Sequence, residues 1–232
     1  MNNGPQHAWL FQVLRWSTRL QLVAWLRTAG KQHFCVALFA GLAGMLTLGT
    51  ITMAAVLTNL PLLFPPLAPS AFILFTTPMA LSASPRNVVG AHTLAVLAGL
   101  FALHVMQWIS PHSGLEDPVN MNWARVATIG LAMALVTVLM ATGHCMHPPA
   151  AASAMLGAMG YLTEPAKAAG LLGATILLVL EAIILNRLLG GLPYPIWRAD
   201  PGQARRYGSL AGMARARTDH WQQLAEKISQ RW

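Results

Sequence analysis

Long apolar stretches dominate the middle of the chain, and short polar or proline-containing segments separate them. Four of these stretches reach the length of about 20 residues that a helix needs to cross a hydrocarbon core about 30 Å thick. We therefore expect membrane-spanning helices at approximately residues 34–58, 88–109, 123–142 and 166–189.

Two further apolar stretches, at 60–82 and 147–162, begin with prolines. Because proline has no backbone N–H, each stretch should start as non-helical chain and become helical only downstream. Residues 110–122 contain two prolines and two carboxylates, which predicts a loop outside the membrane. The expected fold is an all-α, polytopic membrane protein with two interrupted or re-entrant helices.

Composition and charge narrow the class further. Of the 232 residues, 55% are apolar and 9% are charged, and the mean hydropathy is +0.51; ordinary soluble domains contain about 25% charged residues. A water-soluble single domain is thereby nearly excluded. The formal net charge of +8 comes from basic residues at the two ends of the chain, where they flank the apolar block, so we expect no nucleic-acid partner. The positive-inside rule places both termini in the cytoplasm, at a bacterial inner membrane.

The chain divides into three parts. Residues 1–31 mix arginines with Trp, Leu and Val, as in an amphipathic helix that lies at the membrane interface or packs on the cytoplasmic end of the bundle. Residues 32–190 form the transmembrane domain. Residues 191–232 follow a Gly-Gly-Leu-Pro helix stop and form a basic cytoplasmic tail, whose last part, 209–232, is suited to one basic helix.

An internal repeat organises the transmembrane domain. Residues 65–71 and 148–154 share the pattern Pro-Pro-x-x-x-Ser-Ala, 83 positions apart, and residues 85–90 and 165–170 share Pro-x-x-x-x-Gly, 80 positions apart. Each half therefore consists of an apolar helix, a proline-led segment and a helix that proline and glycine open. Two matches in the same order favour duplication over chance.

The number of crossings decides how the two halves are related. Three crossings in each half require the second copy to be inverted, as in many transporters with interrupted helices. If each proline-led segment enters and leaves on one side, the chain has four full spans and the halves are parallel. The charge distribution slightly favours six spans and inverted halves.

The two proline-led helix starts are candidate binding elements. A helix that starts inside the membrane exposes its first backbone N–H groups, and each unpaired donor in hydrocarbon is costly. Ser70 and Ser153 lie near these starts, where a hydroxyl can cap the helix, bond the preceding turn or contact a ligand. Pro148 and Pro149 either belong to this site or only start the helix. Two facing helix ends would form a partly positive pocket that suits a small monovalent anion.

Histidines cluster near the same places. His147 directly precedes the second proline pair, and His92 follows Asn87 at the start of the helix that Pro85 opens. A histidine there can contact or gate an anion, or couple it to a proton. Glu181, a carboxylate within the last span, is either a proton carrier or one half of a structural polar pair. Close helix packing is expected at several glycines, namely Gly41, Gly44, Gly49, Gly90 and Gly99.

Three segments in order, 68–75, 84–92 and 147–150, resemble the HPP family of integral membrane proteins, which is named for a His-Pro-Pro tripeptide present here at 147–149. The resemblance covers approximately residues 35–190. It implies a multi-pass membrane transporter, with plastid and cyanobacterial members associated with nitrite transport. The family is described as having four spans, whereas the charge distribution favours six.

The leading hypothesis is a transporter or channel for a small monovalent anion, with nitrite and nitrate, which the family resemblance suggests, as the first candidates. We expect no enzymatic activity and no cofactor, and a homo-oligomer embedded in the lipid bilayer. The candidate path residues are Ser70, Asn87, His92, His147, Pro148, Pro149 and Ser153. Two alternatives stay open. One is a haem- or metal-binding redox protein that uses His92, His104, His144 and Cys145; the other is a non-transporting membrane scaffold whose basic tails recruit a partner.

Overall fold

The computed structural model describes residues 21–22 and 32–212, and every regular element within them is helical. Four of the helices are long and apolar enough to cross a membrane. They begin within three residues of the expected positions, which confirms the spans read from the apolar stretches. These long helices are α3 (Gln32–Thr58), α5 (Pro85–Ile109), α6 (Trp123–Thr142) and α8 (Pro165–Leu188).

The two proline-led segments form short helices, as expected. Residues 59–66 are non-helical and lead into α4 (Leu67–Thr76), while the 3₁₀ turn η3 (Pro148–Ala150) leads into α7 (Ala151–Ala158). With 10 and 8 residues, these helices are about 15 and 12 Å long, half or less of a hydrocarbon core. In the described part of the chain, four helices reach spanning length, so the two proline-led segments contribute partial helices; the expectation of six crossings stays a prediction.

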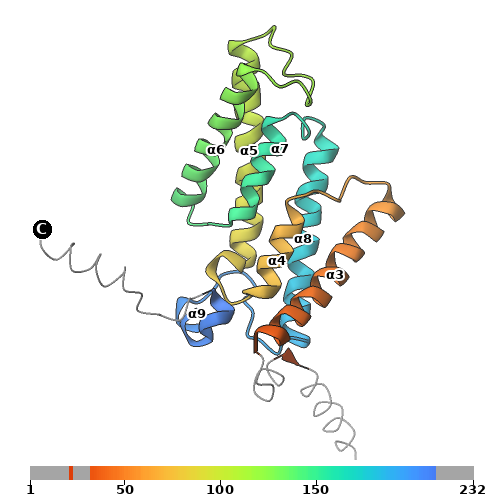
Figure 1. The fold of residues 1–232 in the computed structure, drawn as a ribbon, viewed down its shortest axis with the longest axis vertical. Helices are drawn as coiled ribbons and strands as arrows, with labels where there is room; N and C mark the ends of the chain where they lie inside the picture. Colours follow the sequence, from red (N-terminus) through yellow and green to blue (C-terminus); the bar gives the residue numbers. More distant parts are fainter. Residues whose placement is uncertain (1–20, 23–31, 213–232) are drawn as a thin grey trace, which may run out of the picture.

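Successive helices alternate in direction along the long axis of the molecule. In Figure 1, α3, α5 and α7 run upward, and α4, α6 and α8 run downward. The start of α3 and the end of α8 consequently lie at the same, lower end. The first three helices and the last three thus run in opposite senses, element by element.

The helices pack as two groups of three, each built from both halves of the sequence. One group contains α3, α4 and α8, and the other contains α5, α6 and α7. The third helix of each half packs with the first two helices of the other half: α5 packs with α6 and α7, and α8 packs with α3 and α4. Two glycines lie at contacts between the exchanged helices and their new neighbours. A Cβ on Gly90 would contact Cys145, and a Cβ on Gly170 would lie 2.1 Å from the carbonyl oxygen of Pro61. The sequence duplication itself stays a prediction.

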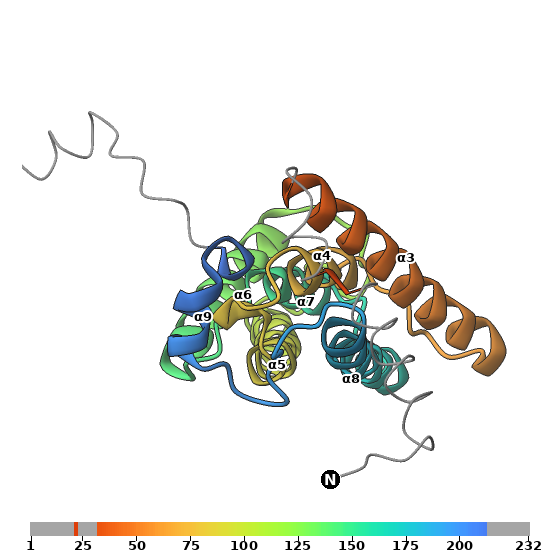
Figure 2. The ribbon, with the colours of Figure 1, turned by 90° about the horizontal axis from the view of Figure 1, so that it is seen from below.

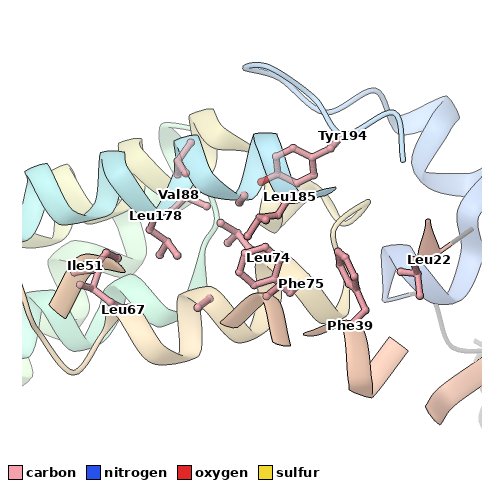
Figure 3. Close-up of a cluster of buried hydrophobic side chains, with 14 of the residues drawn as sticks. Leu22, Phe39, Ile51, Leu67, Leu74, Phe75, Val88, Leu178, Leu185 and Tyr194 are labelled. Carbon is pink, nitrogen blue, oxygen red and sulfur yellow. The ribbon is translucent and has the colours of Figure 1, made fainter. Parts of the chain in front are cut away.

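The cores of the two groups differ in side-chain size. Large residues fill the first, including Phe39, Leu74, Phe75 and Leu178 (Figure 3). The second is lined mainly by alanines, namely Ala91, Ala95, Ala98, Ala102, Ala132, Ala150, Ala154 and Ala158. There α5 and α7 approach so closely that a Cβ on Gly99 would lie 2.2 Å from the carbonyl oxygen of Ala154. The close packing expected at Gly99 is confirmed.

The glycines of α3 behave differently from expectation. A Cβ on Gly41, Gly44 or Gly49 would meet nothing within 4 Å, so none of them is a close-packing position within the described chain. One side of α3 is lined with exposed apolar side chains, including Phe34, Leu42 and Met53. Such a face is suited to lipid contact.

The first part of the C-terminal tail folds back onto the lower end of the bundle (Figure 1). The Gly-Gly stop is confirmed, since α8 ends at Leu188. The chain then forms α9 (Pro201–Tyr207) and η4 (Gly208–Ala211), and Leu210 packs against Met79 in a small apolar cluster. The amphipathic segment expected at 1–31 falls almost entirely outside the described residues, as does most of the basic helix expected at 209–232.

Arg125 explains how a cation fits near the start of α6. Its guanidinium group is buried and donates to backbone carbonyls at the end of α7 and in the 110–122 loop, including those of Ala158, Leu115 and Asp117. Arg86, near the start of α5, similarly donates to the carbonyls of Gly143 and His144 after α6. Both arginines thus bind carbonyls that a helix end leaves without an intrahelical partner.

Candidate functional site

The short helices α4 and α7 lie near the middle of the bundle (Figure 2), and α4 contacts η3, which leads into α7. Four polar side chains converge there. Ser70 comes from the first turn of α4, His92 from the second turn of α5, Ser153 from the first turn of α7, and His147 from the residue before η3. All four have an exposed fraction of 0%. We call these four residues the Ser/His cluster.

The cluster forms a continuous hydrogen-bonded chain. His92 lies between the two short helices, with Nδ1 2.8 Å from Ser153 Oγ and Nε2 3.0 Å from Ser70 Oγ. Ser70 Oγ is also 2.9 Å from His147 Nε2, and His147 Nδ1 is 2.8 Å from the backbone carbonyl oxygen of Ser82. The two imidazole rings are 5.5 Å apart, centre to centre. One histidine therefore joins the first turns of both short helices.

The sequence places these side chains for local reasons. The Pro-Pro pairs start both short helices at fixed φ, so the serine of each Pro-Pro-x-x-x-Ser pattern falls in the first turn of regular helix. Ser70 Oγ also lies 2.9 Å from the carbonyl oxygen of Pro66, one turn earlier, within hydrogen-bond distance. Back-bonding and contact with another side chain, which were alternatives in the sequence, therefore both occur at Ser70.

Free backbone donors are scarce at these helix starts, contrary to expectation. The N–H groups of Leu67 and Ala68 donate to the carbonyls of Phe64 and Pro65. At η3, the N–H of Ala150 likewise donates to a preceding carbonyl, and the two prolines before it have no N–H. Side chains, and not helix-end amides, are thus the polar groups that the two starts bring together.

Asn87 does not join the cluster. It lies five residues before His92 on α5, a rotation of about 140° around the helix. Its side-chain amide instead donates to the carbonyls of Leu81 and Met146. These two contacts tie the short turn η2 (Leu81–Ala83) to the segment that precedes η3.

An open hollow of about 490 Å³ lies beside the cluster. Its lining includes Asn87, Met146 and Ser82, the residue whose carbonyl accepts from His147. Residues Ala204 and Ala211 of the folded tail complete it, so the hollow lies at the end of the molecule where α3 starts and α8 ends (Figure 1). The hydrogen-bonded chain thus runs from the contact of the short helices to the wall of this hollow.

Tyr194 contacts the turn η2, which also contains Ser82. Its hydroxyl donates to the carbonyl of Ala83, next to Ser82, and the ring is fully buried. Burial raises the pKa of Tyr194 above its usual value, because the charged form would be desolvated. The hydroxyl therefore stays protonated and remains a donor. The two prolines of the His-Pro-Pro segment also have structural positions: Pro149 is buried and Pro148 is exposed.

A family model for the transmembrane region of HPP proteins matches residues 28–195, which is well over half of the chain. The chain belongs to the HPP family. The expected resemblance is thereby confirmed, and the family's eponymous tripeptide contributes His147 to the cluster. No curated protein and no solved structure matches the chain.

The residues of the redox alternative do not gather in this HPP protein. His104 is exposed, and its Nδ1 lies 2.7 Å from the carbonyl oxygen of Leu100 in its own helix. His144 is exposed, and burial raises the pKa of the Cys145 thiol, which disfavours the thiolate that metals bind. Within residues 21–22 and 32–212, no three His, Cys, Asp or Glu side chains are arranged to hold a metal ion.

Glu181 has a partner that the sequence did not indicate. Its Oε1 is hydrogen-bonded to Thr50 Oγ1, 2.5 Å away, which joins α8 to α3. Its other carboxyl oxygen and the hydroxyl of Thr47, one turn before Thr50, are buried without a partner among the described residues. The structure thus places Glu181 in a polar contact between two spans, as one of the two alternatives anticipated.

Proposed function

We propose that this HPP protein is a transporter or channel for a small monovalent anion, with nitrite and nitrate as the first candidates. The observation that carries the proposal is the Ser/His cluster: two hydroxyls and two imidazoles converge, without a fully charged side chain, at the meeting point of two interrupted helices. Transporter sites typically lie where discontinuous helices meet.

The chemistry of the cluster suits an ion that has to be bound and then released. Each neutral residue contributes one hydrogen, on Ser70, His92, His147 or Ser153, that can point toward an anion. A hydrogen bond to a charged acceptor is stronger than one between neutral groups, so an entering anion can replace the bonds within the cluster. A permanently charged lysine or arginine at the same place would hold the anion more tightly and slow its departure.

The route to the cluster begins at the hollow beside Ser82 and Asn87. Because the four cluster side chains are fully buried, transport requires a movement that opens this contact. In this proposal the protein lies in a bacterial inner membrane with both termini in the cytoplasm, as a homo-oligomer surrounded by lipid, and it moves the anion without chemical conversion.

A flux assay in proteoliposomes tests the proposal. We expect purified protein to carry nitrite and nitrate, and we expect Ser153→Ala and His92→Gln to lower the flux about tenfold or more, since one hydrogen bond to an anion contributes about 1.5–3 kcal/mol. Matched controls are Thr93→Ala and His104→Gln on the same helix. Among the described residues, Thr93 Oγ1 bonds only the carbonyl of Val89, and His104 is exposed. No flux of nitrite, nitrate or chloride by the wild type would refute the proposal.

A further inference from the structure

The hydroxyl of Ser70 has three neighbours but only one hydrogen to donate. Its Oγ lies 2.9 Å from the carbonyl oxygen of Pro66, 3.0 Å from His92 Nε2 and 2.9 Å from His147 Nε2. A carbonyl oxygen can only accept, whereas a ring nitrogen donates or accepts according to its protonation. The position of this one hydrogen is therefore linked to the protonation of His147.

The direction of the chain is fixed at its end. His147 Nδ1 faces the carbonyl oxygen of Ser82 at 2.8 Å, so Nδ1 has to carry a hydrogen. In a neutral His147 the other nitrogen, Nε2, is then bare and accepts the hydroxyl hydrogen of Ser70.

The neutral arrangement of the cluster is complete and runs in one direction. Ser153 donates to His92 Nδ1, His92 Nε2 donates to Ser70, Ser70 donates to His147, and His147 donates to the carbonyl of Ser82. The carbonyl of Pro66 still accepts from the backbone N–H of Ser70. Every polar atom of the cluster side chains then has a partner.

A second complete arrangement contains one more proton. If the hydroxyl of Ser70 turns to Pro66, its oxygen accepts from both Nε2 atoms. His147 then carries hydrogens on both nitrogens and is an imidazolium, while His92 keeps the same neutral form. Rotation of one hydroxyl hydrogen thus accommodates one added proton without moving a heavy atom.

Among the residues that the structure describes, the surroundings supply no countercharge for that proton. The four short elements α4, η2, η3 and α7 contain no titratable side chain. On α5, Arg86 is engaged with backbone carbonyls and His104 is exposed. On α8, Glu181 bonds Thr50 of α3, Arg187 bonds the carbonyl of Tyr194, and Lys167 pairs with Glu164 at the surface. The Tyr194 hydroxyl bonds Ala83, and the Cys145 thiol is buried.

A protonated cluster without a countercharge is costly in a membrane interior. A monovalent anion removes that cost, because the anion and the proton together add no net charge. We propose that the Ser/His cluster binds one proton with each anion, which makes the transport step an electroneutral proton–anion symport. The anion half of this inference rests on the proposed function; the directional hydrogen-bond chain does not.

Calorimetry with nitrate measures the coupling directly. Nitrate is the anion of a strong acid and takes up no proton itself, so protons taken up on binding at neutral pH belong to the protein. Titrations in buffers with different ionisation enthalpies should give about one proton per bound nitrate for the wild type and for His104→Gln. His147→Gln should take up none. Binding with no proton uptake by the wild type would overturn the inference and leave the anion proposal standing.

Nitrogen NMR of ¹⁵N-histidine-labelled protein tests the chain without any anion. We expect His147 to carry its hydrogen on Nδ1 and His92 on Nε2, assigned by comparison with His147→Gln and His92→Gln. The opposite tautomer at either residue would overturn the proton arrangement. If the expected tautomers are present but nitrate, nitrite and chloride all fail to bind, the proposed function and the coupling fail together while the chain itself is confirmed.

Discussion

The two groups of three helices hold themselves together in different ways. In the group of α3, α4 and α8, large apolar side chains fill the space between helices (Figure 3). In the group of α5, α6 and α7, alanines and glycines let the backbones approach, and Gly99 and Gly157 face each other across the contact of α5 and α7. The first group is therefore stabilised by large side chains that fill the space between its helices, and the second by small residues that let the helix backbones come close together.

This difference bears on the Ser/His cluster, which lies between the groups. Ser70 belongs to the group with the large core, whereas His92 and Ser153 belong to the closely packed one. The 2.8 Å contact between His92 and Ser153 depends on the close approach of α5 to α7. A substitution in either group should therefore affect the cluster. In the first group the damage comes from removing a large side chain, and in the second from adding one.

The largest loss of stability is expected for Gly99→Leu, because Gly99 lies in the close contact of α5 and α7. Even the Cβ would lie 2.2 Å from the carbonyl oxygen of Ala154, so α5 and α7 have to separate. The unfolding free energy should fall by more than about 3 kcal/mol, the upper end of ordinary overpacking, as measured by steric trapping in bicelles. Gly130→Leu is the control, since a Cβ there meets nothing within 4 Å. Equal losses in the two variants would contradict the close-contact account.

In the group of α3, α4 and α8, the damaging substitution is one that shortens a buried side chain. Leu178 on α8 is fully buried, and Leu178→Ala should leave a cavity that lowers the unfolding free energy by about 2–5 kcal/mol. Leu180→Ala, on the same helix but with a side chain that is 52% exposed, should cost less than about 1 kcal/mol because lipid replaces the lost contacts. The same measurement applies. A small effect at Leu178 would mean that this group repacks and that the contrast between the two cores is wrong.

The smallest effect should come from the polar contact between the spans α3 and α8 of the large-residue group. Thr50→Val removes the hydroxyl that bonds Glu181, and hydrogen bonds between membrane helices contribute about 1 kcal/mol. Thr52→Val serves as the control, because Thr52 Oγ1 bonds the carbonyl of Leu48 in its own helix. Thermal unfolding in detergent should show a drop for Thr50→Val alone. Identical melting temperatures for the two variants would remove Glu181 from the contacts that stabilise this group.

Much of the fold could be predicted because the bilayer sets simple rules. The apolar run of residues 123–142 has the length and composition of a span, and α6 occupies those positions. Proline chemistry likewise predicted that the helices after Pro66 and Pro149 would start late. Sparse charges were a weaker guide to the number of crossings: Arg125, which six crossings place imperfectly, is buried against backbone carbonyls and so does not mark one side of the membrane.

The site was predictable as a set of residues but not as a set of contacts. Ser70, His92, His147 and Ser153 were selected for their proximity to helix starts, and the structure brings them together. Asn87 was selected on the same ground and lies elsewhere, because five residues of helix turn it away from His92. The carbonyl of Ser82 and the contact of Thr50 with Glu181 had no sequence signal, since any residue has a carbonyl and threonines are common in these helices.

By itself, the sequence determined which segments are apolar enough to enter a membrane, where prolines prevent a helix from starting, and which polar residues lie near those starts. These are local properties that follow from hydropathy and backbone chemistry. Only the tertiary structure decided that α5 and α8 exchange groups, and that one hydroxyl, on Ser70, is shared between two imidazoles and a carbonyl. Such contacts join residues up to 77 positions apart in the sequence, so they depend on how the helices pack.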